Sequence, residues 1–136
     1  MTDAVVAGAN DDAIDGVDVR VQRAFDTTVD DVRACDGIVL GTPENFGYMS
    51  GAIKDFFERI YYPLLEETQG LPYALFVKAS TDGDGAVQSI ERIVAGLRWK
   101  LVMPPIVVIG DLAPTDLERC QELGATIAAG LVAGIF

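Results

Sequence analysis

The stretch Gly41-Thr42-Pro43-Glu44-Asn45-Phe46-Gly47-Tyr48-Met49-Ser50-Gly51 joins two segments of different periodicity in this chain of 136 residues. The apolar run Ile38-Val39-Leu40 leads into it, as expected of a buried strand, and the run from Ile53 to Leu64 repeats its apolar residues at helical spacing. A connection that only reverses the chain does not need three glycines, a proline and two aromatic residues. We therefore expect a ligand to lie against this stretch.

The rest of the chain alternates between strands and helices. The apolar runs 37–40, 74–77 and 106–109 predict strands buried on both faces, and Val17–Gln22, which alternates strictly, predicts an edge strand with one wet face. Helices are predicted at about 1–10, from Ser50 until Gly70 and Pro72, at 87–97 and at 117–131. This order predicts a single α/β domain over residues 1–136, a three-layer open parallel sheet with helices on both faces.

Several residues predict the ends of helices or the interior. Thr28 is expected to cap a short helix that ends near Cys35, and Asp84 to cap the helix after the 74–77 strand. Thr115 and Glu118 have the spacing of a capping box for the last helix. The single tryptophan, Trp99, is expected to be a largely buried structural indole.

Composition narrows the function classes. The chain has 21 acidic and 10 basic residues, a net charge of −11, which argues against nucleic acid or an anionic membrane as a partner. The longest apolar stretch, Leu123–Phe136, is shorter than the ~20 residues that span a bilayer. The sequence does not start with the basic segment of a secretory signal peptide. We therefore expect a cytoplasmic protein. The chain has no histidine, which removes histidine-activated nucleophiles, and Cys35 and Cys120 lack metal spacing and are expected to be reduced thiols.

A second polar loop follows the 74–77 strand. It comprises Ser80, Thr81, Asp82, Gly83, Asp84 and Gly85. The carboxyl ends of parallel strands meet at one edge of a sheet, so this loop and the 41–51 stretch are expected to lie close together. Glycines that let backbone N–H groups approach a ligand, with Phe46 and Tyr48 as flat faces, suit a planar heteroaromatic ring with carbonyl oxygens. The alternative is that the glycines and Pro43 only make turns and that Phe46 caps the core.

The 41–51 stretch followed by Lys54 and Phe57 resembles the second flavin loop of the flavodoxin-like family, in its NAD(P)H-dependent FMN and quinone reductase branch. The resemblance extends from Val17 to the final helix. It implies a 2-1-3-4-5 strand order, FMN as cofactor and NAD(P)H as co-substrate. It also implies ring contacts, chiefly through backbone amides, from Thr42, Pro43, Glu44, Asn45, Phe46 and Gly47 and, on the other side, from Ser80, Thr81, Asp82, Gly83 and Gly85. No catalytic or metal-binding side chain is implied, because hydride chemistry belongs to the flavin.

The chain departs from the family at its start. Met1–Gly8 is similar to the helix that follows the family's first strand and phosphate loop, so both of those are expected to be missing. Two explanations are left open. The sequence starts at an internal methionine or is a fragment, or it is a short form in which the Val17–Gln22 strand pairs directly with the Ile38 strand or receives a strand from a partner.

Three functions follow from these expectations. The first is an FMN-dependent oxidoreductase that transfers electrons from NAD(P)H to a quinone or similar small acceptor. The second is a non-catalytic flavodoxin-like module, or a truncated chain that cannot bind FMN tightly. The third is a flavodoxin-type electron carrier, which the acidic balance suits. The resemblance also implies a homodimer or homotetramer.

Overall fold

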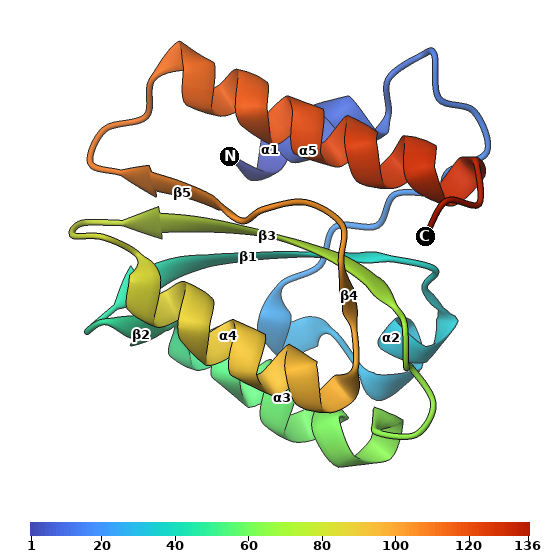
Figure 1. The fold of residues 1–136 in the computed structure, drawn as a ribbon, viewed down its shortest axis with the longest axis horizontal. Helices are drawn as coiled ribbons and strands as arrows, with labels where there is room; N and C mark the ends of the chain where they lie inside the picture. The colour runs from blue at the N-terminus through green and yellow to red at the C-terminus, as the bar shows by residue number, and fades with distance from the viewer.

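Parallel strands form the middle layer of the structure, a computed structural model that describes all residues from Met1 to Phe136 (Figure 1). The central strand β3 (Pro72–Ala79) pairs in parallel with β1 (Ile38–Asn45) on one side, and with β4 (Lys100–Leu101) and β5 (Ile106–Ile109) on the other. A short strand, β2 (Tyr48–Met49), pairs antiparallel with the end of β1. Strands β1, β3 and β5 contain the three predicted apolar runs, except Gly37. Only the run in β3 is buried throughout, because Ile38 and Val39 of β1 are half-buried and Ile109 of β5 is exposed.

Helices cover both faces of this sheet, as predicted. Figure 1 shows α1 (Thr2–Ala9) and α5 (Pro114–Val132) on one face, and α3 (Gly51–Leu64) and α4 (Asp84–Leu97) on the other, with α2 (Val29–Ala34) beside them. Each face has its own hydrophobic cluster. Phe57, Ile60, Leu75 and Ile90 lie in the larger one on the α3 and α4 side, and Phe76 and Leu123 in the smaller one below α5.

Helix α1 docks on α5 through glycines. A Cβ on Gly8 would lie 1.8 Å from the Gln121 carbonyl oxygen, and a Cβ on Gly124 would lie 1.9 Å from the Val5 carbonyl oxygen. Only glycine fits at both positions, because any side chain would overlap the backbone of the opposite helix. The first and last helices of the chain are therefore in backbone contact.

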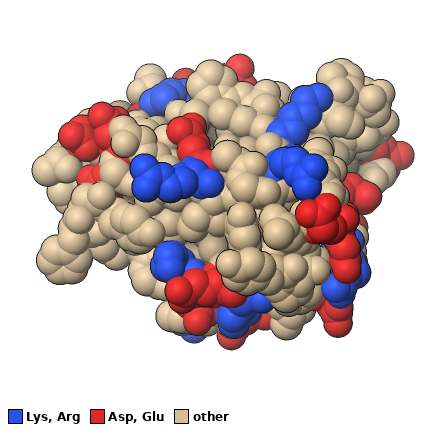
Figure 2. Space-filling model, turned by 60° about the horizontal axis from the view of Figure 1, so that its bottom comes forward, with Lys and Arg blue, Asp and Glu red and all other residues tan.

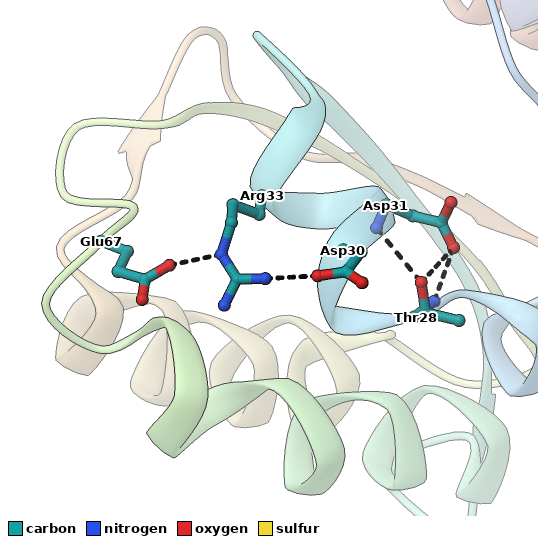
Figure 3. A network of polar contacts seen from close by, with 5 residues as sticks. All are labelled: Thr28, Asp30, Asp31, Arg33 and Glu67. Atoms are coloured by element: carbon teal, nitrogen blue, oxygen red, sulfur yellow. Dashed lines mark hydrogen bonds and ion pairs between the residues drawn. The ribbon is translucent and has the colours of Figure 1, made fainter.

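Helix α2 begins at the predicted cap and is tied to the turn after α3 (Figure 3). The Asp31 N–H donates to Thr28 Oγ1 at 3.2 Å and the Thr28 N–H donates to Asp31 Oδ2 at 2.8 Å, which lowers the pKa of the Asp31 carboxyl. Arg33 donates to Asp30 and, through Nε at 2.6 Å, to Glu67. The Arg33–Glu67 contact therefore joins α2 to the turn that follows α3.

The predicted edge strand is absent from the structure, and this is the main difference from the predicted fold. Residues Val17–Gln22 form no strand and pair with no other segment, although they alternate as an edge strand would. A strand exists only where a neighbour completes its hydrogen-bond ladder. A groove lies between this segment and β1, so the direct pairing considered from the sequence is wrong.

Two predicted helix ends are also wrong. Helix α3 ends at Leu64, well before Gly70, although Leu65–Glu67 continue as a turn. Helix α5 has Ala113 as its N-cap, two residues before the predicted Thr115, because Pro114 takes the first helical position and the Asp116 carboxylate accepts from the Ala113 N–H at 2.9 Å.

The expectation for Trp99 is confirmed. Its indole is buried and Nε1 donates to Thr68 Oγ1 at 2.9 Å, so the polar atom of the ring is satisfied inside the core. Cys120 is buried and Cys35 partly so, both as free thiols, and burial raises the pKa of each.

The surface carries both signs of charge despite the acidic balance. Figure 2 shows acidic and basic side chains interspersed on the face that is turned forward. On α3 the pairs Lys54–Glu58 and Arg59–Asp55 bridge neighbouring turns, and Arg59 also donates to the Thr27 carbonyl at 2.6 Å. No helix combines the length and the apolar character that crossing a bilayer requires.

Candidate functional site

The 41–51 stretch is a β-hairpin, where a loop was predicted. Strand β1 continues to Asn45 and the chain returns through β2, with Asn45 opposite Tyr48. Phe46 and Gly47 make the two-residue turn, with φ angles of 52° and 66°. Positive φ at both central residues is the type I′ geometry, whose twist matches that of the flanking strands. The hairpin therefore projects rigidly from the carboxyl edge of the sheet.

Phe46, at the hairpin tip, has both an exposed apolar side chain and a strained backbone. Its side chain is fully exposed, at 107% relative exposure, which excludes the alternative that it caps the core. Its left-handed backbone costs a non-glycine residue about 1–2 kcal/mol. A strained backbone and an exposed aromatic ring at one residue are typical of a ligand clamp. At such sites a conformation that lowers stability is kept because binding requires it.

The second predicted loop packs directly against the hairpin. A Cβ on Gly85 would lie 1.8 Å from the Gly47 carbonyl oxygen, so glycine at 85 is required by a backbone contact between the two segments. The Met49 N–H also donates to Ser89 Oγ of α4 at 3.3 Å. The prediction that the two segments lie side by side is therefore confirmed.

The Glu44 carboxylate holds the two segments together. Oε1 accepts from Thr81 Oγ1 at 3.0 Å and from the Gly83 N–H at 3.3 Å, and Oε2 accepts from the Ala86 N–H at 3.3 Å. Glu44 thus caps the start of α4 from a different strand, where the helix dipole favours a negative charge. Asp84, the predicted cap, is instead the first residue of α4.

The Thr42 hydroxyl forms hydrogen bonds within the 41–51 stretch. It is buried, and its hydroxyl accepts from the Ser50 N–H at 3.1 Å and donates to the Pro43 carbonyl at 2.9 Å. Ser50 in turn caps α3, accepting from the Ile53 N–H. The Thr42 side chain is therefore not free to contact a ligand.

The other predicted site residues gather at the carboxyl edge, with different accessibility. The exposed ones are Pro43, Asn45, Phe46, Gly47, Ser80, Thr81 and Asp82; Glu44 and Gly85 are half-buried, and Gly83 is buried. The Asp82 side chain accepts from the Asp84 N–H at 3.0 Å, which shapes the turn into α4.

A cavity of about 330 Å³ adjoins this edge and contains residues that the sequence analysis missed. Its walls include Met1, Thr2, Lys78 and Leu112 together with the 41–43 backbone. Lys78 carries the only charged side chain in β3, and that exception in an apolar strand is a signal that could have identified it. Met1 and Thr2 stand at the start of α1, and the first N–H groups of a helix have no partner within the helix.

Comparisons with known proteins agree on this fold. Residues 8–113 match the sequence profile of the family described as "NADPH-dependent FMN reductase". A protein of Aquifex aeolicus (strain VF5) named "Flavodoxin" is 31% identical over 144 aligned positions, which cover 94% of this chain and 77% of that protein.

Solved structures extend the same comparison. A flavodoxin from the domain Archaea superposes with a TM-score of 0.78 at 21% identity, over 96% of this chain and 87% of its own. The flavodiiron protein of Giardia intestinalis gives a TM-score of 0.80 at 14% identity, over 97% of this chain but only 32% of the larger protein. At these identities the structures establish the fold alone.

Proposed function

Because the chain belongs to the NADPH-dependent FMN reductase family and has a flavodoxin-like fold, we propose that it is an FMN-dependent oxidoreductase, transferring electrons from NAD(P)H to a quinone or similar small acceptor. The observation that carries the proposal is the strained, fully exposed Phe46 on a hairpin that Glu44 fixes against the second loop. Such an arrangement has no role in packing the core and is suited to holding a flat ring.

The residues present fit the isoalloxazine ring. Phe46 offers an apolar face, and the adjoining backbone of Asn45 and Gly47 is exposed on the same tip. The Ser80–Asp82 segment offers hydroxyls and backbone groups on the neighbouring loop. In this proposal the Glu44 contacts position both segments, and the Thr42 backbone, not its hydroxyl, faces the cofactor.

The fit to the FMN phosphate is weaker. The cavity of about 330 Å³ places Lys78 and the start of α1 beside the 41–43 backbone, and a cation with free N–H groups is what a phosphate needs. These residues are not the phosphate loop that the resemblance implies for the family. We therefore expect the ring contacts and Lys78 to provide most of the affinity, with weaker binding than a complete phosphate loop gives.

The protein's part in the reaction is positioning. When bound, FMN supplies the hydride and electron chemistry, so no acid or base of the chain is required. The hairpin and the second loop orient the ring and shield one part of it from water. The exposed edge of the site leaves room for a nicotinamide and then an acceptor to approach in turn.

A fluorescence titration of FMN with the purified protein tests the binding step. We expect quenching that saturates at one FMN per chain, and a Phe46→Ala variant that quenches more weakly. Tyr62→Ala is the control, because Tyr62 is also an exposed aromatic residue but lies on α3, outside the site. Oxidation of NADPH or NADH in the presence of FMN and a quinone, above the rate with free FMN, tests the reaction. Absence of quenching from the folded protein refutes the proposal and favours the non-catalytic module.

A flavodoxin-type electron carrier is the second candidate. The 31% identity to the Aquifex aeolicus flavodoxin and the net charge of −11 favour it, because acidic surfaces steer association with basic redox partners. The same assay separates the two functions. FMN binding without nicotinamide oxidation indicates the carrier, and binding with nicotinamide oxidation indicates the reductase.

The assembly and the compartment are also proposed here. We propose a cytoplasmic homodimer or homotetramer, supported by the exposed apolar side chains of Val132 and Ile135 at the end of α5. Sedimentation velocity of the wild type and of a Val132→Ser, Ile135→Ser variant tests the assembly. A monomeric wild type at all concentrations contradicts it.

A further inference from the structure

Helix α4 holds the second strand of the hairpin as well as the first. On β1, Glu44 accepts from the Ala86 N–H of α4 at 3.3 Å. On β2, which returns from the hairpin tip, the Met49 N–H donates to Ser89 Oγ at 3.3 Å, about one turn further along the same helix. Figure 1 shows the start of α4 beside β2. The hairpin is therefore attached to one helix through both of its strands, and Ser89 makes the attachment of β2.

The Ser89 hydroxyl is oriented for this contact by a second hydrogen bond. It donates to the Ala86 carbonyl at 3.0 Å, so its proton is engaged within the helix and an oxygen lone pair remains for the Met49 N–H. Ala86 is buried and donates its own N–H to Glu44. The contacts thus run from Met49 through Ser89 and Ala86 to Glu44. They close a ring, because Glu44 and Met49 lie directly opposite one another in the hairpin.

The hairpin itself offers no partner to the Met49 N–H. The pair that flanks a two-residue turn, here Asn45 and Tyr48, exchanges hydrogen bonds between the strands, and the next pair does not. The Met49 N–H therefore points out of the hairpin, away from β1. Met49 is only 2% exposed, so loss of the Ser89 oxygen would leave a buried donor without a partner, which is more costly than the loss of an ordinary hydrogen bond.

We propose that Ser89 is a positioning residue for the flavin ring, because its hydroxyl fixes β2 on α4 and, through β2, the Phe46 tip. Ser89 is half-buried and belongs to neither of the two segments expected to contact the ring, so it acts through Met49. The inference rests on the proposed function, since a fixed tip serves the flavin only if FMN binds there. The attachment of β2 by Ser89 does not itself require FMN.

Hydrogen exchange of the FMN-free protein tests the attachment of β2. Ser89→Ala removes the acceptor, and we expect the Met49 amide to exchange at least about tenfold faster, as the loss of a buried hydrogen bond implies. Ser89→Thr keeps a hydroxyl on the same carbon and should keep the exchange slow. Gln88→Ala is the control, because Gln88 is the exposed neighbour of Ser89 on α4, and it should leave the Met49 amide unchanged.

A fluorescence titration with FMN tests the positioning. We expect Ser89→Ala to raise the Kd for FMN at least about fivefold and Ser89→Thr to restore it to near the wild-type value. Val94→Ala separates positioning from a general loss of stability. Val94 is buried further along α4, so its truncation should lower the Tm without changing the Kd.

Four results overturn the inference while the proposed function stands. They are exchange of the Met49 amide at the wild-type rate in Ser89→Ala, an unchanged Kd for FMN in Ser89→Ala, failure of Ser89→Thr to restore either value, and a rise in Kd in Val94→Ala as large as that in Ser89→Ala. Absence of quenching by the wild-type protein refutes the proposed function and the flavin role of Ser89 together. The exchange of the Met49 amide then still decides whether Ser89 attaches β2.

Discussion

Substitution of Glu44 by alanine tests whether the two site segments are held by one carboxylate. The change removes three hydrogen bonds, at 3.0, 3.3 and 3.3 Å, and the negative charge at the start of α4. A hydrogen bond to a charged group contributes about 1.5–3 kcal/mol, and a helix N-cap about 0.5–2 kcal/mol. Glu44 is only half-buried and two of its bonds are long, so water replaces part of the loss. We expect the free energy of unfolding to fall by about 2 kcal/mol.

That loss is measurable as a shift in Tm. An unfolding entropy of about 2.1 cal/mol/K per residue gives about 0.29 kcal/mol/K for 136 residues, so a loss of about 2 kcal/mol lowers Tm by about 7 °C. Urea denaturation gives the free energy directly, and hydrogen exchange should show faster exchange of the Gly83 and Ala86 amides. Glu44→Gln keeps one acceptor oxygen and should lose about half as much.

Glu58→Gln is the matched control, because it neutralises an exposed carboxylate whose partner is Lys54 one turn away on α3. Such helix pairs contribute about 0.3–0.5 kcal/mol. If Glu44→Ala is no less stable than Glu58→Gln, or if the start of α4 exchanges no faster, the carboxylate does not hold the segments and the interpretation of the site is wrong.

Three further predictions concern the same structure. Phe46→Gly should raise the free energy of unfolding by about 1 kcal/mol, because it relieves a left-handed φ, yet weaken FMN quenching; a loss of stability in urea denaturation contradicts the strain argument. Gly85→Ala places a methyl group against the Gly47 carbonyl oxygen and should cost about 1–3 kcal/mol as well as FMN affinity, and unchanged values in both titrations would show that the contact is loose. Burial raises the pKa of Cys120 above its ordinary value of 9.0, so the folded state holds the thiol proton more tightly than the unfolded state. The stability that this provides is complete below pH 9.0 and is lost as pH rises above it; Cys120→Ala should show a smaller loss, and an identical pH profile of urea midpoints in the two proteins contradicts the prediction.

Elements that bury apolar side chains could be predicted from the sequence. Each of their patterns lies within one segment of the sequence. This holds for the apolar runs in β3 and β5, for the helical repeats of α3, α4 and α5, and for the cap of α2 at Thr28. The Val17–Gln22 strand could not be predicted correctly, because alternation reports which face would be wet but not whether a neighbouring strand is present. Pairing is a property of two segments.

The candidate site shows the same division. The sequence identified both segments and their proximity, since the carboxyl ends of adjacent parallel strands meet. It gave no sign that Glu44 caps a helix some forty positions later, because a local motif search expects the cap at Asp84. The hairpin was also not predicted, because Phe46 occupies a turn position at which asparagine or glycine is usual.

The glycine contact between α1 and α5 joins two helices between which all the strands of the sheet lie in the sequence. The sheet face that these two helices cover, with Phe76 and Val108, is therefore closed by long-range contacts. The α3 and α4 face is covered by helices that adjoin, in the sequence, the strands on which they pack. Local contacts form faster than long-range ones, so we expect the α3 and α4 face to be covered first during folding and the α1 and α5 face to be covered last.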